Sequence, residues 1–162
     1  MIWAADSPPV MLAPGLLRLF YYNSTNGSIR HAWSNATGWH FETLDGAGNI
    51  SIGKSTDNVG LNATAIQYDN SLQLFYNDTT NNTLLHAWSN ATGWHFETLD
   101  GSTSSDSKYS GNVGINVSAT INNGSLQVLY FNMNDGTLRH AWTSLTSPWQ
   151  FEDLDSNVIY PQ

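Results

Sequence analysis

HAWSNATGWHFETLDG, residues 31–46, recurs without a change as residues 86–101. A third, diverged copy begins at His140 and reads HAWTSLTSPWQFEDLDS. The copies begin at residues 31, 86 and 140, so the chain repeats with a period of about 54 residues. Identity over a stretch of this length does not arise by chance. The repeat therefore marks one structural unit that occurs three times.

The sequence of each unit predicts a four-stranded antiparallel meander. Two short β-prone stretches precede and include each His-Ala-Trp run, and they are separated by residue pairs that favour a type I′ hairpin turn. These pairs are Asn26-Gly27, Asn81-Asn82 and Asp135-Gly136. Upstream tight turns are expected at Pro14-Gly15, Asp69-Asn70 and Asn123-Gly124. A fourth strand ends at Asp45, Asp100 or Asp155, and no segment has the apolar spacing of a helix, so the chain is predicted to be all-β.

Four-stranded sheets that recur every 40 to 55 residues or so are typical of β-propeller blades. We expect a single, partial propeller domain over residues 1–162, with repeats at approximately 7–46, 62–101 and 116–156. Three blades are too few to close a ring, because propellers typically have about four to eight. We therefore expect two chains to associate head to tail into a six-bladed ring, with a trimer as the alternative.

Composition excludes several kinds of partner. Five Lys and Arg against thirteen Asp and Glu give a net charge of −8, which argues against nucleic acid and anionic membranes. No apolar run is long enough to span a bilayer, and Met1 to Val10 lacks the pattern of a signal peptide. Cysteine is absent, and no cofactor is expected. Charged residues make up 11% and aromatic residues 12%, a polar but uncharged surface with rings that suits sugars.

The run LRLFYYNSTNGSIRHAW resembles the blades of fungal and bacterial fucose-binding propeller lectins. The pairing of DGTLRHAW with GWHFETLDG is similar to Photorhabdus-type propeller lectins and related secreted bacterial domains. The resemblance implies metal-free sugar sites between adjacent blades, ring completion by oligomerisation and an extracellular location. In the fucose-binding members, an Arg and a Glu hold the sugar and a ring of the next blade stacks on it. Arg18 lies near the Arg position, which is Gln73 or Gln127 in the other copies, and histidines occupy the Glu position.

The candidate ligand-binding residues recur at equivalent places in the units. They are Trp39, Trp94, Trp149, His31, His86, His140, Arg30, Arg139, Glu42, Glu97 and Arg18. The tryptophans follow a loop and are expected either to stack on a pyranose or to start a strand in the core. Trp33, Trp88 and Trp142 are expected in the core between blades.

The polar candidates also have two interpretations. A neutral imidazole can accept a hydrogen bond from a sugar hydroxyl, and the alternative is a structural histidine held by hydrogen bonds. The glutamates can bind vicinal hydroxyls or pair with Arg30 and Arg139. The three recurring histidines belong to different units, so a shared metal site is not expected.

These features together predict a multivalent, non-catalytic lectin whose partners are glycans. Glycoside hydrolysis needs two carboxylates in different environments, and near-identical repeats do not supply that asymmetry. No Gly-x-Ser-x-Gly motif or Asp-x-Asp calcium loop is present. The alternatives are a structural or protein-binding propeller, natural or artificially symmetrised, and a glycan-targeting domain of a larger secreted enzyme.

Overall fold

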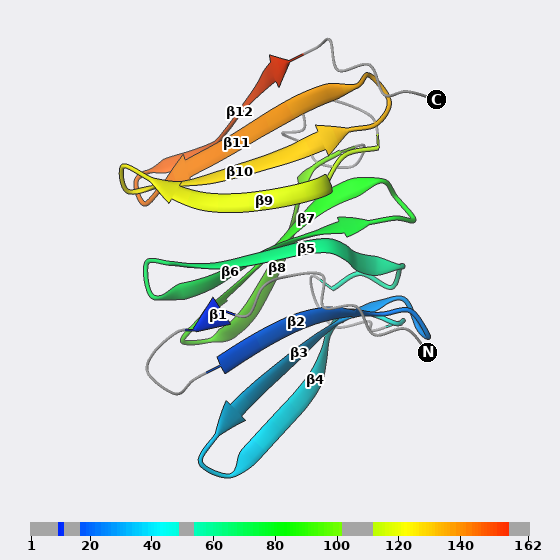
Figure 1. The fold of residues 1–162 in the computed structure, drawn as a ribbon, viewed down its shortest axis with the longest axis vertical. Coiled ribbons are helices and arrows are strands. Elements are labelled where there is room, and N and C mark those ends of the chain that lie inside the picture. Colours follow the sequence, from blue (N-terminus) through cyan, green and yellow to red (C-terminus); the bar gives the residue numbers. More distant parts are fainter. Residues whose placement is uncertain (1–9, 12–16, 49–53, 102–111, 156–162) are drawn as a thin grey trace.

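The computed structural model describes residues 10–11, 17–48, 54–101 and 112–155. These residues form twelve strands in three separate four-stranded sheets, and every pair of neighbouring strands is antiparallel (Figure 1). The prediction of an all-β chain is confirmed for this part of the protein. Within these ranges there is no helix that has the length and hydropathy to cross a bilayer.

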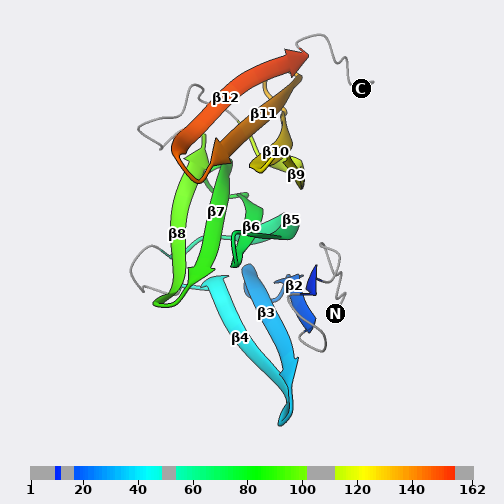
Figure 2. The ribbon, with the colours of Figure 1, turned by 90° about the vertical axis from the view of Figure 1, so that its left-hand side faces the viewer.

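Each repeat forms one sheet whose strands are in chain order, as expected of a propeller blade. The first blade contains β1 (Val10–Met11), β2 (Leu17–Asn23), β3 (Ser28–Asn35) and β4 (Gly38–Gly46). The second contains β5 (Val59–Tyr68), β6 (Ser71–Asp78), β7 (Thr83–Asn90) and β8 (Gly93–Asp100). The third contains β9 (Ile115–Asn122), β10 (Ser125–Asn132), β11 (Thr137–Ser144) and β12 (Ser147–Asp155). Figure 2 shows β4, β8 and β12 at one edge of the stack.

The hairpin between the second and third strands of each blade differs from the predicted type I′ turn. Its loop has four residues, and only the last one has a positive φ, at Gly27, Asn82 and Gly136. In the first blade, the Asn23 side chain accepts a hydrogen bond from the backbone N–H of Thr25 at 3.0 Å. Such a side-chain bond starts a wider turn, and the final left-handed residue then returns the chain to the sheet. The two-residue prediction is therefore wrong at these three sites.

The turns between the first and second strands agree with the sequence. Asp69 and Asn70 have φ values of 47° and 58°, and Asn123 and Gly124 have 49° and 76°. Positive φ at both central residues is the property that defines a type I′ turn. The expected turn at Pro14-Gly15 lies outside the described residues.

The core lies between blades. One buried cluster joins the first and second blades and includes Phe20, Ile29, Leu44, Val59 and Leu74. A second cluster joins the second and third blades and includes Phe75, Leu84, Val113, Leu126 and Val128. The first sheet therefore buries apolar side chains against the second, and the second against the third.

The Asn-Val-Gly motif at the end of each linker allows a close approach between blades. Gly60 has a φ of 111°, and a Cβ there would lie 2.7 Å from the Cβ of Ile29. Gly114 has a φ of 86°, and its Cβ would lie 3.1 Å from the Cα of Leu84. Both glycines let the incoming first strand pass directly over the third strand of the preceding blade.

Replacing Gly60 with alanine is expected to lower the free energy of unfolding by about 2 to 5 kcal/mol, because a strained backbone is combined with a clash against Ile29. Gly93 is the matched control, since its φ is 117° but nothing lies within 4 Å of its Cβ position. Gly93→Ala is expected to cost only about 1 to 3 kcal/mol. Chemical denaturation measures both values, and equal losses would show that the contact with Ile29 is not tight.

Candidate functional site between adjacent blades

A row of stacked rings crosses one face of the first blade. Phe20 on β2 lies opposite His31 on β3, and Trp33 on β3 lies opposite His40 on β4. The ring centroids are 4.8 Å apart for Phe20 and His31, 4.9 Å for His31 and Trp33, and 5.2 Å for Trp33 and His40. The strand register therefore places four aromatic side chains in one continuous stack.

The second blade repeats this row and the third retains part of it. The row of the second blade consists of Phe75, His86, Trp88 and His95. Successive ring centroids lie 4.7, 5.0 and 5.3 Å apart. In the third blade His140 and Trp142 stack at 4.8 Å. Leu129 and Gln150 occupy the positions of the other two rings. The His-Trp pair is thus the constant part of the row.

A tryptophan of the next blade meets each row edge-on. Trp94 of the second blade lies 5.9 Å from Phe20 and 5.7 Å from His31, at interplanar angles of 84° and 76°. Trp149 of the third blade meets the equivalent rings of the second at 5.9 and 5.5 Å. Edge-to-face contacts of this kind are favourable and directional. Two candidate tryptophans therefore complete sites between blades.

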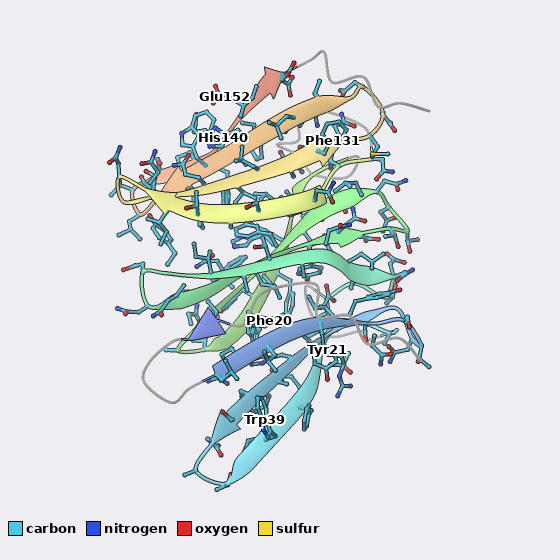
Figure 3. The ribbon with its side chains drawn as sticks, in the orientation of Figure 1. Phe20, Tyr21, Trp39, Phe131, His140 and Glu152 are labelled. Carbon is cyan, nitrogen blue, oxygen red and sulfur yellow. The ribbon has the colours of Figure 1, made fainter. Side chains whose placement is uncertain are left out.

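Trp39, the equivalent residue of the first blade, lies on an open face. Its side chain is 49% exposed and stacks only loosely on Phe41, at 6.4 Å. Figure 3 shows Trp39 on the first blade at one end of the stack, and His140 with Glu152 on the third blade at the other. Among the described residues, each end of the stack therefore carries only part of the ring arrangement that lies between blades.

The third-strand histidine of each blade is paired with a glutamate on the fourth strand. The Nδ1 to Oε1 distances are 2.8 Å for His31 and Glu42, 2.7 Å for His86 and Glu97, and 2.9 Å for His140 and Glu152. A carboxylate accepts hydrogen bonds, so Nδ1 carries the proton in each pair. Among the described residues, no three His, Cys, Asp or Glu side chains converge as metal ligands.

Burial favours the neutral form of two of these histidines. It lowers the pKa of His86 below the ordinary value, although the hydrogen bond to Glu97 acts in the opposite direction. Burial likewise lowers the pKa of His31, although the hydrogen bond to Glu42 and its charge act in the opposite direction; the positive charge of Arg18 adds a smaller lowering effect. At neutral pH both rings are therefore uncharged, with the proton on Nδ1.

The second ring nitrogen has different surroundings in different blades. Gln73 bonds His86 Nε2 at 2.8 Å, and Gln127 bonds His140 Nε2 at 2.6 Å, each through the side-chain amide. Because an amide flip exchanges oxygen and nitrogen, the bond forms with either a protonated or a neutral ring. In the first blade Arg18 takes the place of the glutamine, and its guanidinium lies 5.7 Å from the ring centroid of Trp33.

A cavity of about 460 Å³ opens at the interface of the second and third blades. Its lining includes Gln73, His86, Trp88, Glu97, Leu126 and Trp149. Its volume is within the range of small-molecule sites, and its walls combine two indole rings with several hydrogen-bonding groups. This arrangement offers flat apolar surface beside polar atoms.

The arginines on the third strand lie away from these histidines. Arg30 donates a hydrogen bond to Thr43 at 2.8 Å. Arg139 is buried and lies 3.1 to 3.3 Å from three carboxylates, those of Asp100, Asp135 and Asp153. The expectation that Arg30 and Arg139 pair with the glutamates is therefore wrong, because histidine takes that place.

The tryptophans of the third strands are less buried than expected. Trp33, Trp88 and Trp142 are half-buried, and Trp88 lines the cavity instead of lying in the core between blades. Neither Trp88 nor Gln73 is among the ligand-binding residues expected from the sequence. Their signal was available, since Gln73 aligns with Arg18 in the repeat and Trp88 lies two residues after His86 on the same strand face.

No protein-family model and no curated protein matches this sequence. Among solved structures, the fold is similar to that of a fucose lectin from Kordia zhangzhouensis in complex with methyl-fucoside. The TM-score is 0.53, and the alignment covers 90% of this chain and 96% of that chain at 12% identity. At this identity the likeness concerns the fold alone.

We expect His86 to titrate below its ordinary pKa of 6.5, because burial disfavours the imidazolium. The unfolded chain binds a proton at a higher pH than the folded chain, so this residue's contribution to stability is lost as pH falls below 6.5. Nitrogen-15 NMR of the imidazole through a pH titration measures the pKa. A value at or above 6.5 would contradict the assignment of a neutral ring.

Proposed function

We propose that this protein is a non-catalytic lectin that binds carbohydrate between adjacent blades. The observation that carries the proposal is the cavity between the second and third blades, where Trp88 and Trp149 contribute rings and His86, Glu97 and Gln73 contribute polar groups. A sugar has an apolar face of C–H groups and a rim of hydroxyls that both donate and accept hydrogen bonds. Rings beside such a polar cluster match both surfaces.

The fold neighbour gives separate support for this class of ligand. That protein is a fucose lectin in complex with methyl-fucoside, and its fold matches nearly the whole of this chain. We infer carbohydrate as the ligand class from the fold together with the ring-lined cavity. A structural or protein-binding role is the alternative that the first experiment below separates from it.

We further propose that a second copy closes the ring. Within the chain, Trp94 of one blade covers His31 of the blade before it. Within the part of the chain that the structure describes, no other blade covers the face of the third sheet that carries His140 or the face of the first sheet that carries Trp39. Head-to-tail association of two copies would seat Trp39 of each against His140 of the other, giving six blades and six repeated sites.

Repetition of sites gives the proposed lectin its affinity for surfaces. A single shallow site that binds one sugar is weak, since only a few hydrogen bonds and one ring contact are gained. Several sites around one ring bind a glycan-coated surface together, and the effective concentration of each later contact raises the overall affinity. The function therefore depends on both the site and the assembly.

Replacing Trp88 with alanine is expected to weaken sugar binding at the second site about tenfold or more, because a wall of the cavity is removed. A screen against neutral glycans on an array identifies ligands, and calorimetry with a hit measures the change. Tyr22→Ala is the control, because this half-buried aromatic residue lies outside the cavity and bonds Asn58. A folded protein that binds no neutral glycan would contradict the proposal and favour a scaffold role.

Sedimentation equilibrium is expected to give twice the 17.9 kDa mass of the chain. Trp39→Asp should return the mass of the monomer, because a carboxylate would be buried against the partner. Met133→Asp is the matched control, since both side chains are 49% exposed. A monomeric wild-type protein, or equal behaviour of the two variants, would overturn the closed ring.

A further inference from the structure

The three repeated sites differ in a polar side chain on the second strand of the blade. Arg18, Gln73 and Gln127 occupy equivalent positions, each directly across from the tryptophan of the His-Trp pair. The fourth-strand glutamate that bonds the histidine is present in all three blades. The first and second sites share their row of rings, so a difference in hydrogen bonding between these two sites begins at this position.

In the second and third blades the glutamine occupies the outer nitrogen of the histidine. Gln73 bonds His86 Nε2, and Gln127 bonds His140 Nε2. Since the glutamate already bonds Nδ1, both ring nitrogens are engaged by side chains of the same blade. A ligand must displace the glutamine amide before it can bond these rings.

In the first blade the corresponding atoms are buried and lack hydrogen bonds. His31 is only 4% exposed, and its Nε2 has no partner within the described ranges. The Nε of Arg18 is likewise buried without a partner among those residues. An unpaired buried polar atom is costly, so a folded protein retains one mainly where another molecule satisfies it.

The two unpaired atoms have opposite hydrogen-bonding roles. His31 bonds Glu42 through Nδ1, so a neutral ring presents Nε2 as an acceptor. Arg18 has only donors. A hydroxyl group fits both, because it donates to Nε2 and accepts from the guanidinium. A carboxylate or phosphate has no proton to donate, and an ammonium group has no lone pair to accept.

The location of this pair is at the interface with the next blade. The ring centroids of Trp94 and His31 lie 5.7 Å apart, and Arg18 lies over Trp33. A sugar hydroxyl that reached Arg18 and His31 would therefore bring its ring close to two indoles. At the second site the ring centroids of Trp149 and His86 lie 5.5 Å apart, and Gln73 bonds His86 Nε2.

We propose that the three sites are not equivalent and that the site between the first and second blades is the one of highest affinity, where Arg18 and His31 together hold a single sugar hydroxyl. This inference rests on the proposed lectin function. Arg18 is then a specificity-determining residue, and Gln73 and Gln127 act as internal substitutes for a ligand hydroxyl at the other sites.

Calorimetric titration with methyl-fucoside and with methyl glycosides of galactose, mannose and N-acetylglucosamine tests the inference. The wild-type protein is expected to show about one tighter site per chain. Arg18→Gln should weaken that site about tenfold or more, because the new glutamine would occupy His31 Nε2. Gln73→Arg should instead add a second tight site. Arg18→Lys retains the charge without the planar fork, so it should restore affinity only in part.

Two measurements without calorimetry separate the possible failures. Nitrogen-15 NMR should show the signal of His31 Nε2 moving on addition of the sugar before those of His86 and His140. In the absence of sugar, Arg18→Gln should raise the thermal midpoint, whereas Arg18→Met should not, because only glutamine can bond His31.

The outcomes have distinct meanings. Sugar binding that is indifferent to Arg18→Gln would overturn the inequality of the sites and leave the lectin function intact. Failure of every glycoside to bind, with all variants folded, would overturn both proposals.

Discussion

The packing of one blade's tryptophan edge-on against the ring stack of the preceding blade is the contact on which the rest of this structure depends. A four-stranded sheet has two faces, and a single sheet of this size cannot bury both of them. Trp94 and Trp149 cover the apolar row of the preceding blade, and the buried clusters lie directly beside these contacts. Stability and the candidate site are thus properties of the interface, since the same rings contribute to both.

This dependence explains why polar groups occupy so much of the interface. A histidine within a stack of rings can remain neutral and still bond Glu97 and Gln73, so its burial leaves no ring nitrogen unpaired in the second blade. The ring stack alone would make a hydrophobic core. With the glutamate and the glutamine beside it, the interface also offers directional groups at the mouth of a cavity.

Near-identical repeats acquire different environments through single substitutions. Arg139 of the third blade fills the space beside Asp100, whereas Leu85 of the second blade lines a cavity of about 340 Å³ beside the equivalent Asp45. Burial raises the pKa of Asp45, although hydrogen bonds from Tyr76 and the backbone act against the shift. The exchange of Arg18 for glutamine at the position across from the tryptophan of the His-Trp pair is a second case of the same kind. A single side chain per repeat is therefore enough to give different polar contacts to interfaces that have the same backbone arrangement.

The sequence by itself determined the period, the strands of each unit, the two-residue turns at Asp69-Asn70 and Asn123-Gly124, and the recurrence of tryptophan and histidine at equivalent places. These features follow from alternation and turn chemistry, which act over a few neighbouring residues. Only the tertiary structure decided that Trp94 meets His31, that the glutamates bond histidine instead of arginine, and that the central hairpins have four-residue loops. Contacts between blades join residues far apart in the chain, so they depend on how the twisted sheets stack. Where two side chains could bond the same group, the packed geometry selects one of them.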